Sequence, residues 1–373
     1  MSAPASLLDL IRPEVRAERA YLVPTEADAR AKLDQNESPY DLPAELKREL
    51  ALRFAEADWN RYPDDRPRRL AAALATKLGH PKDGLLFGRG SNDIVHTIGL
   101  AFLGRDVPVV LPRPMFALFE SVARMHAARV VGVNADVNLR HDASAILRAA
   151  QEANAALTVV TTPNNPTGQT IPFEGVQVLA EGVPGFLLVD EAYYEFVEGL
   201  TADALVARHP NVLVLRTFSK AMGLAGLRIG YLLGDPDVIR EVEKARLPFL
   251  VDRFSEEVAL ALLDRPALVA ERAARLTAER ERVLARLSGV DGAETLPGAA
   301  NFFLLRTALP PRVLIERLAA GGVRIRDMSG YPALDGWARV SVGAPAENDA
   351  FLGALEGVLA EAAPARSQAP AAS

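Results

Sequence analysis

The segment Thr217-Phe218-Ser219-Lys220-Ala221-Met222-Gly223-Leu224-Ala225-Gly226-Leu227-Arg228 follows a β-rich run and places one lysine among small residues, eight positions before an arginine. Most lysines are solvated surface charges. Here the apolar neighbours predict that the segment enters a hydrophobic core; they are Phe218, Met222, Leu224 and Leu227. Burial would lower the pKa of the Lys220 ammonium from its usual value of about 10.4. An amine tuned in this way suits Schiff-base chemistry with a carbonyl compound.

Composition excludes several classes of protein. The 373 residues suggest about two domains, and 49% hydrophobic residues exclude global disorder. A net charge of −6 argues against nucleic acid or an anionic membrane as partner. Cysteine is absent and the five histidines lie far apart, so we expect no disulfide and no metal site. The N-terminus has no signal-peptide pattern and no apolar run approaches about 18 residues, so we expect a soluble cytoplasmic protein.

Short β-branched runs alternate with amphipathic stretches in the first two thirds of the chain. The runs are Leu85–Phe87, Val107–Leu111, Val130–Val133, Leu157–Thr161, Phe186–Val189, Val212–Leu215 and Ile229–Leu233. The helical stretches include Asp93–Leu103, Met115–His126 and Ala143–Asn154. This alternation predicts an α/β fold with a mostly parallel seven-stranded sheet between helices.

The pattern changes after Pro236, where a long amphipathic helix is expected over about residues 267–287. The strands and helix expected beyond it are Phe302–Leu305, Pro311–Ala320, Val323–Arg326 and Trp337–Val342, followed by a C-terminal helix. We therefore expect an N-terminal arm (1–37), a large cofactor domain (38–250), a smaller α+β domain (251–362) and a disordered tail (363–373).

Three loops that follow strands carry candidate chemistry. Gly88-Arg89-Gly90-Ser91-Asn92-Asp93 opens a helix, so its backbone N–H groups could bind a phosphate, although it fits neither the dinucleotide nor the P-loop pattern. Thr162-Pro163-Asn164-Asn165-Pro166-Thr167-Gly168 is either a simple turn or a ligand loop at the sheet edge. Asp190 ends an apolar strand, where it either caps the next turn or pairs with a cation such as a protonated pyridine nitrogen.

Together these motifs resemble the class II pyridoxal-phosphate-dependent aminotransferases of fold type I, and among them the histidinol-phosphate aminotransferases. The resemblance extends from Leu33-Asp34-Gln35-Asn36-Glu37-Ser38-Pro39 to Arg339-Val340-Ser341-Val342-Gly343. It implies pyridoxal 5′-phosphate as cofactor. It also implies that Lys220 forms a Schiff base with this cofactor and then moves a proton, that Asp190 pairs with the pyridine nitrogen, and that Asn165 and Tyr193 hold the phenolic oxygen.

The resemblance also assigns the remaining site residues. The cofactor phosphate would be held by Ser91, Asn92, Ser219 and Arg228. Phe116 would stack on the ring, where the family usually has tyrosine, and Tyr62 would reach the cofactor of a neighbouring subunit, which implies a homodimer with shared sites. The substrate would be bound by Arg326, Arg339, Asn165 and Asn36. The arm reads Arg12-Pro13-Glu14 where the family often has Pro-Tyr, and whether Tyr21 compensates stays open.

The implied reaction is a ping-pong transamination of L-histidinol phosphate and 2-oxoglutarate to imidazole-acetol phosphate and L-glutamate, in histidine biosynthesis. Two alternatives on the same fold are an aromatic amino-acid aminotransferase and a threonine-phosphate decarboxylase. An alternative of another class is a pyridoxal-phosphate-binding transcriptional regulator. That class requires a DNA-binding domain ahead of a cofactor domain that here begins by about residue 38.

Overall fold

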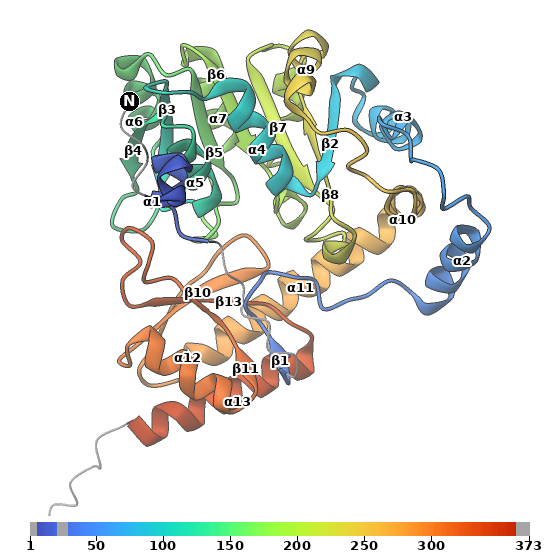
Figure 1. The fold of residues 1–373 in the computed structure, drawn as a ribbon. Coiled ribbons are helices and arrows are strands. Elements are labelled where there is room, and N and C mark those ends of the chain that lie inside the picture. The colour runs from blue at the N-terminus through green and yellow to red at the C-terminus, as the bar shows by residue number, and fades with distance from the viewer. Residues whose placement is uncertain (1–5, 21–28, 363–373) are drawn as a thin grey trace, which may run out of the picture.

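A computed structural model of the chain describes residues 6–20 and 29–362 and shows a large sheet body joined to a smaller sheet domain (Figure 1). Tyr21 and the tail from residue 363, for which expectations are given above, lie outside the described residues. In the described ranges no helix combines the length and apolarity needed to cross a membrane.

The large body contains a seven-stranded sheet. In spatial order its strands are β2 (Leu85–Arg89), β8 (Ile229–Leu233), β7 (Val212–Thr217), β6 (Phe186–Asp190), β5 (Leu157–Thr161), β3 (Pro108–Arg113) and β4 (Arg129–Asn134). Only β8 runs antiparallel to its neighbours, β2 and β7. The other strand pairs are parallel. The predicted mostly parallel sheet is therefore confirmed, and each of the seven predicted runs is a strand.

Helices cover both faces of this sheet because its central strands are apolar on both sides. One face packs against α4 (Ser91–Phe102), α5 (Ala117–Met125) and α9 (Pro236–Val242). The opposite face packs against α3 (Arg68–Leu78), α6 (Ala143–Ala153), α7 (Phe173–Gly182) and α10 (Arg253–Leu263). The predicted helices in this region are present, with ends displaced by no more than two residues.

The smaller domain follows α11 (Pro266–Leu287), which runs between the two bodies in Figure 1. Its antiparallel sheet has the order β12 (Arg326–Asp327), β13 (Trp337–Ser341), β10 (Phe302–Thr307) and β9 (Ala293–Leu296). It packs against α11 and two further helices, α12 (Pro311–Ala320) and α13 (Pro345–Ala362). The prediction of one strand over Val323–Arg326 is wrong. The chain changes partners at Ile325, so β11 (Val323–Arg324) pairs with β1 (Ala31–Lys32) while β12 pairs with β13.

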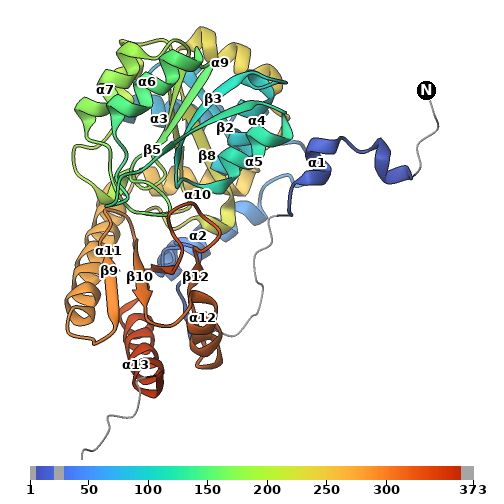
Figure 2. The ribbon, with the colours of Figure 1, turned by 90° about the vertical axis from the view of Figure 1, so that its left-hand side faces the viewer.

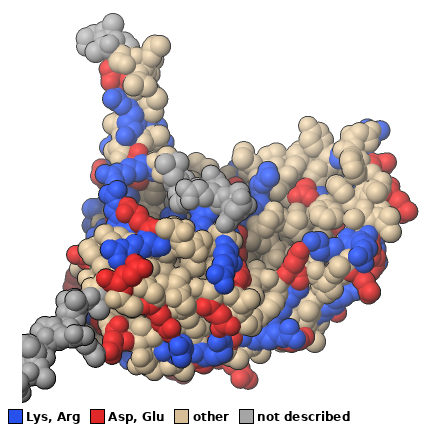
Figure 3. Space-filling model, turned by 90° about the horizontal axis from the view of Figure 1, so that it is seen from below, with Lys and Arg blue, Asp and Glu red and all other residues tan. Residues whose placement is uncertain are grey.

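The remaining elements complete the fold. They are η1 (Leu7–Leu10), α1 (Pro13–Ala17), α2 (Ala44–Ala55), η2 (Lys82–Gly84), η3 (Tyr194–Phe196), α8 (Asp203–Val206), η4 (Ala225–Leu227) and η5 (Glu243–Ala245). The elements η1 and α1 reach away from the body beside α5 (Figure 2). The predicted domain boundary at residue 250 stays a prediction, but α10 shares the core of the large sheet. Seen from below, acidic and basic side chains are interspersed (Figure 3).

Candidate active site

A cleft of about 410 Å³ lies where the ends of β5, β6 and β7 face the small domain. Every predicted site residue except Tyr62 lines this cleft. They are Asn36, Ser91, Asn92, Phe116, Asn165, Asp190, Tyr193, Ser219, Lys220, Arg228, Arg326 and Arg339. The position agrees with the rule that open α/β sheets bind ligands beyond the carboxyl ends of their strands.

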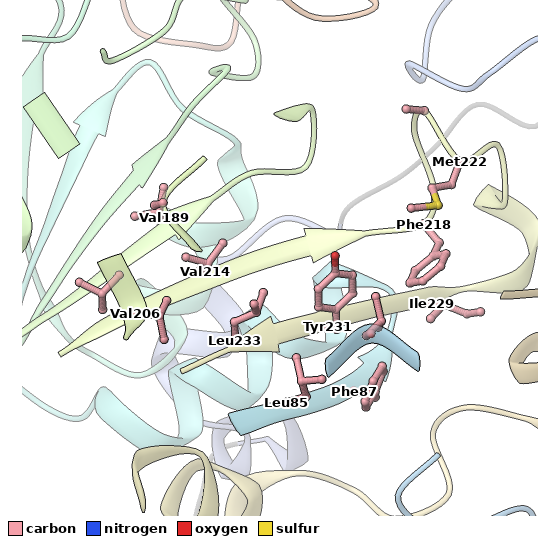
Figure 4. Packing of buried hydrophobic residues seen from close by; sticks show 14 of the residues in the cluster. Leu85, Phe87, Val189, Val206, Val214, Phe218, Met222, Ile229, Tyr231 and Leu233 are labelled. Carbon is pink, nitrogen blue, oxygen red and sulfur yellow. The ribbon is translucent and has the colours of Figure 1, made fainter. Parts of the chain in front are cut away.

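Lys220 is fixed in the cleft by the apolar residues on either side of it. Phe218 is fully buried and packs edge-on against Tyr231, and Met222 lies in the same core (Figure 4). The Lys220 Nζ donates a hydrogen bond to the carbonyl oxygen of Gln35 at 3.0 Å. Desolvation lowers the pKa of Lys220 to about 7, so a large share of this amine is uncharged at neutral pH.

Asp190 lies at the end of β6 with its carboxyl group buried. Its Oδ1 accepts the backbone N–H of Ala192 at 3.0 Å, so it does cap the following turn. Desolvation nevertheless raises the pKa of Asp190 to about 7. One backbone hydrogen bond does not compensate a buried carboxylate, and a cationic ligand group placed beside it would restore the charged form.

Tyr193 and Asn165 each form a hydrogen bond with a residue outside the large sheet. The Tyr193 hydroxyl accepts a hydrogen bond from Asn36 Nδ2 at 2.9 Å, and burial raises the pKa of Tyr193 to about 12. Tyr193 is therefore a neutral phenol that can donate its proton at physiological pH. Asn165 Oδ1 accepts from Arg339 at 2.6 Å, so what its amide can offer a ligand is an N–H donor.

An anion cradle lies between the start of α4 and the loop after β7. Ser91 and Asn92 are the first residues of α4, where unpaired backbone N–H groups and the helix dipole favour negative charge. Arg228 lies opposite and donates to Ser219 Oγ at 3.4 Å. Gly90 has a φ of +76°, and an added Cβ would collide with the Arg228 guanidinium. A phosphate fits this site, because the free N–H groups at the start of α4 and the Arg228 guanidinium are all donors suited to an anion.

The two candidate substrate arginines are direct cross-strand neighbours. Arg326 in β12 pairs in register with Arg339 in β13. Like charges directly opposite one another destabilise a sheet, so their placement favours an anion between or beside them. Arg339 is buried and donates to the Asp34 carbonyl at 2.9 Å. The spacing of thirteen residues in the sequence therefore reflects a turn that brings both guanidinium groups to one wall of the cleft.

Two predicted cofactor residues differ sharply in their surroundings. Phe116 precedes the first residue of α5 and presents its ring to the cleft. Tyr62 lies outside the cleft, with 79% of its surface exposed, and stacks on Phe249 with ring centroids 4.6 Å apart. Tyr62 therefore does not line the cleft of its own chain, and its predicted role toward a second subunit stays a prediction.

The sequence did not reveal the part that the residues after β1 play in the cleft. The carbonyl oxygens of Asp34 and Gln35 accept from Arg339 and Lys220 respectively. Asn36 bonds to Tyr193 and to Ser341, a residue that sequence reasoning did not select. Backbone acceptors leave no side-chain signature, and these contacts span more than a hundred residues. The only available signal was the run Leu33–Pro39 itself.

Comparison with known proteins agrees with this geometry. The profile of the family described as "Aminotransferase class I and II" matches residues 30–355. The chain belongs to this family. Relatives named histidinol-phosphate aminotransferase include the Chlorobaculum tepidum protein, 37% identical over 93% of this chain and 99% of that protein. The protein of that name from Chlorobium phaeobacteroides is 39% identical over 92% of this chain and 95% of its own length.

Solved structures of the family share this fold. The histidinol-phosphate aminotransferase of Sinorhizobium meliloti, solved in complex with pyridoxal-5′-phosphate, superposes with a TM-score of 0.84 at 27% identity, covering 94% of this chain and 98% of that one. The L-threonine-O-3-phosphate decarboxylase of Porphyromonas gingivalis has a TM-score of 0.78 at 24% identity, covering 88% and 99%. At that identity the second likeness shows the fold alone, and the fold is that of the fold type I enzymes.

Proposed function

We propose that this family member is a histidinol-phosphate aminotransferase that uses pyridoxal 5′-phosphate. The observation that carries the proposal is the cleft itself, which gathers a lysine with a lowered pKa, a buried carboxyl group and an arginine pair. Near 37% identity over nine tenths of the chain to relatives of that name supports the substrate assignment. The reaction moves the amino group of L-histidinol phosphate onto 2-oxoglutarate, giving imidazole-acetol phosphate and L-glutamate.

The residues present fit the cofactor at each of its ends. The start of α4 with Ser219 and Arg228 would hold the phosphate, and Phe116 would pack on the ring. Asp190 would pair with the ring nitrogen, which explains an otherwise uncompensated buried carboxyl group. Tyr193 and Asn165 would donate to the ring oxygen. When bound, pyridoxal phosphate supplies an electron sink that stabilises the carbanion formed at the substrate Cα.

Lys220 would act twice. Its uncharged amine is the form that attacks a carbonyl, and desolvation favours that form at pH 7. The same amine, held near the cleft wall by the Gln35 carbonyl, would then take the proton from the substrate Cα and return it. A general base works best when its pKa lies near the working pH, which the burial of Lys220 achieves.

Arg326 and Arg339 would bind the anionic end of each substrate in turn. Histidinol phosphate carries a phosphate and no α-carboxylate, whereas glutamate carries two carboxylates. A planar guanidinium binds either group through paired hydrogen bonds, so one arginine pair can serve both half-reactions. Two arginines facing each other suit the doubly charged phosphate especially well.

We further propose a homodimer with shared sites. Tyr62 stacks on the exposed ring of Phe249, and Trp59 and Leu247, which are close to these two residues in the sequence, are exposed as well. Exposed apolar patches of this kind on one chain favour a protein interface. A second copy seated there would place Tyr62 beside the cofactor phosphate of its partner.

The test is a comparison of amino donors with purified enzyme and 2-oxoglutarate. We expect glutamate formation from L-histidinol phosphate with kcat/KM at least about tenfold above that from phenylalanine. Replacing Arg326 by Gln should lower kcat/KM for histidinol phosphate by about 10- to 100-fold, because a charged hydrogen-bond pair is lost. Faster turnover of phenylalanine would favour the aromatic aminotransferase, and release of carbon dioxide from threonine phosphate would favour the decarboxylase.

A further inference from the structure

Three buried side chains from distant parts of the chain form one continuous hydrogen-bonded chain. Ser341 in β13 is bonded through its Oγ to Asn36 Oδ1 at 2.9 Å. Asn36 Nδ2 is bonded to the Tyr193 hydroxyl at 2.9 Å. The backbone N–H of Asn36 also donates to Ser341 Oγ at 2.8 Å. This series of hydrogen bonds therefore links the small domain to the cleft face of the large sheet.

The direction of each bond follows from simple counting of protons. A serine hydroxyl has one proton, and Ser341 Oγ already accepts the Asn36 backbone N–H, so its own proton goes to Asn36 Oδ1. This fixes the orientation of the Asn36 amide, with Nδ2 toward Tyr193. The reverse orientation would point an NH2 group at Ser341 and leave a buried hydroxyl proton without this acceptor, which is unfavourable.

Asn36 is held rigidly in this role. Its surface is 1% exposed, and its φ of +54° lies in the left-handed region that asparagine tolerates better than most residues. Its backbone carbonyl accepts from Asn301 Nδ2 at 3.1 Å. Both ends of its side-chain amide bond to protein groups, Oδ1 to Ser341 and Nδ2 to Tyr193, which holds the amide in this orientation.

The orientation of the Asn36 amide determines where the Tyr193 hydroxyl proton can point. An amide N–H can only donate, so the Tyr193 oxygen is the acceptor in this bond and its own proton must point elsewhere. The described part of the chain contains no recorded hydrogen bond donated by this hydroxyl. The side of Tyr193 that remains is the cleft, where Lys220 Nζ lies 5.7 Å from the centre of the ring.

We propose that Asn36 and Ser341 are positioning residues that direct the Tyr193 hydroxyl proton toward the ring oxygen of bound pyridoxal phosphate. This inference rests on the proposed function and gives Asn36 a role other than the substrate contact expected from the sequence. A donated hydrogen bond stabilises the anionic form of the ring oxygen. It therefore lowers the pH at which the bound cofactor loses its proton.

The test is a pH titration of the visible absorbance of the cofactor-bound protein. Ser341→Ala and Asn36→Ala should each raise the midpoint by about half to one pH unit, the equivalent of one ordinary hydrogen bond. Tyr193→Phe should raise it at least as far. In the Tyr193→Phe background, Ser341→Ala should produce no further shift, because Ser341 acts only through the tyrosine.

Each outcome decides the proposal. An unmoved midpoint in both single variants overturns it, as does a Ser341→Ala shift that persists in the Tyr193→Phe background. A raised KM for histidinol phosphate in Asn36→Ala with an unmoved midpoint would make Asn36 a substrate residue instead. A wild-type protein that binds no pyridoxal phosphate would overturn the proposed function, and it is distinguished by the absence of any visible band.

A matched control separates positioning from loss of stability. Asn348 is a buried asparagine of the smaller domain, to which Ser341 also belongs. Its side chain forms hydrogen bonds with Gly343 and Glu279, and none with Tyr193. Asn348→Ala should lower the midpoint of thermal unfolding and leave the pH midpoint of the cofactor unchanged. A shift of equal size in this control would contradict the positioning role.

Discussion

Lys220 and Asp190 are ionisable residues whose charged forms are both disfavoured by burial. Desolvation brings the two pKa values together near 7, one from above and one from below. Paired groups with strongly shifted pKa values in one cleft are a physical sign of an active site. In this chain the shifts also mean that burial of the two groups costs electrostatic free energy, which a cationic ring nitrogen and a carbonyl partner for the amine would relieve.

Replacing Lys220 by Ala should abolish transamination, because no other lysine lines the cleft among the described residues. We expect kcat to fall by at least about 10⁴-fold while the fold is retained. The measurement is glutamate production from histidinol phosphate by the purified variant. Lys244→Ala, which removes an exposed lysine of η5, is the control and should retain full activity. Appreciable turnover by Lys220→Ala would refute the assignment.

Replacing Asp190 by Asn should stabilise the cofactor-free protein in a pH-dependent manner. The unfolded carboxyl has a pKa of about 3.9 and the folded one about 7, so the folded state binds the extra proton between these values. Stability from this group is present at low pH and is lost as pH rises through 7. The asparagine amide cannot ionise, so the variant should gain up to about 4 kcal/mol above pH 7 and little near pH 4.

Urea unfolding of the cofactor-free Asp190→Asn protein at pH 5 and pH 8 measures this difference. Pyridoxal phosphate should then stabilise the variant much less than the wild type, because the ring nitrogen has lost its partner. Asp237→Asn at an exposed position of α9 is the control and should show neither effect. A variant less stable than wild type at pH 8 would show that the carboxylate is compensated within the protein.

Among the secondary-structure elements, the junction between β2 and α4 depends on one glycine. Gly90→Ala places a Cβ where the Arg228 guanidinium lies and forces a residue with a side chain to a φ of +76°. We expect the dissociation constant for pyridoxal phosphate to rise by about 10-fold or more, since the arginine must leave the start of the helix. Equilibrium dialysis of the cofactor checks this.

A second glycine substitution provides the control. Gly353 lies within α13, and a Cβ added there meets open space. Gly353→Ala should therefore stabilise the protein by about 0.5–1 kcal/mol and leave cofactor affinity unchanged. Equal cofactor affinity in Gly90→Ala and wild type would show that the cradle does not bind the phosphate.

The elements that could be predicted are those whose signal is local. The runs of the large sheet are apolar on both faces, and α12 begins and ends where the proline and alanine pattern indicates. The two-residue strands β1 and β11 could not be predicted, because their pairing depends on distant chain segments, Ala31 with Val323, rather than on any periodicity. The predicted strand over Val323–Arg326 failed for the same reason.

In the site, too, the residues with a local sequence signal could be predicted, and those whose role depends on distant contacts could not. Lys220, Asp190 and the loop at Asn165 follow strands, and parallel strands bring their carboxyl ends to one edge, so their meeting could be foreseen. Ser341 could not be found, because its role arises from a contact with Asn36 across 305 positions. The pairing of Arg326 with Arg339 likewise depends on the β12–β13 register, and the two-residue strand β12 is too short to show a sequence pattern.

For the whole molecule, the proposed homodimer with shared sites predicts complementation between two defective chains. Lys220→Ala removes the nucleophile and Tyr62→Ala removes the residue offered to the partner, so each homodimer should have low activity. In a mixed dimer, one site combines Lys220 of one chain with Tyr62 of the other and is intact. Unfolding and refolding the two variants together should yield up to about a quarter of wild-type activity, from half the dimers with one good site each.

Sedimentation velocity of the refolded mixture should confirm dimers. The activity should rise with the mixing ratio to a maximum at equal amounts. Activity equal to the sum of the separate variants would show that Tyr62 serves its own chain or no site at all. Wild-type activity in a protein that sediments as a monomer would also contradict the shared site.

The most direct test of the proposed activity is the absorbance spectrum of the cofactor-bound protein before and after addition of L-histidinol phosphate without a keto acid. We predict that the visible band of the lysine-bound cofactor disappears and the shorter-wavelength band of pyridoxamine phosphate replaces it. Addition of 2-oxoglutarate should restore the first band. A visible band that ignores histidinol phosphate but responds to phenylalanine would contradict the substrate assignment. A protein that shows no such band after incubation with pyridoxal phosphate would contradict the cofactor, the mechanism and the substrate together.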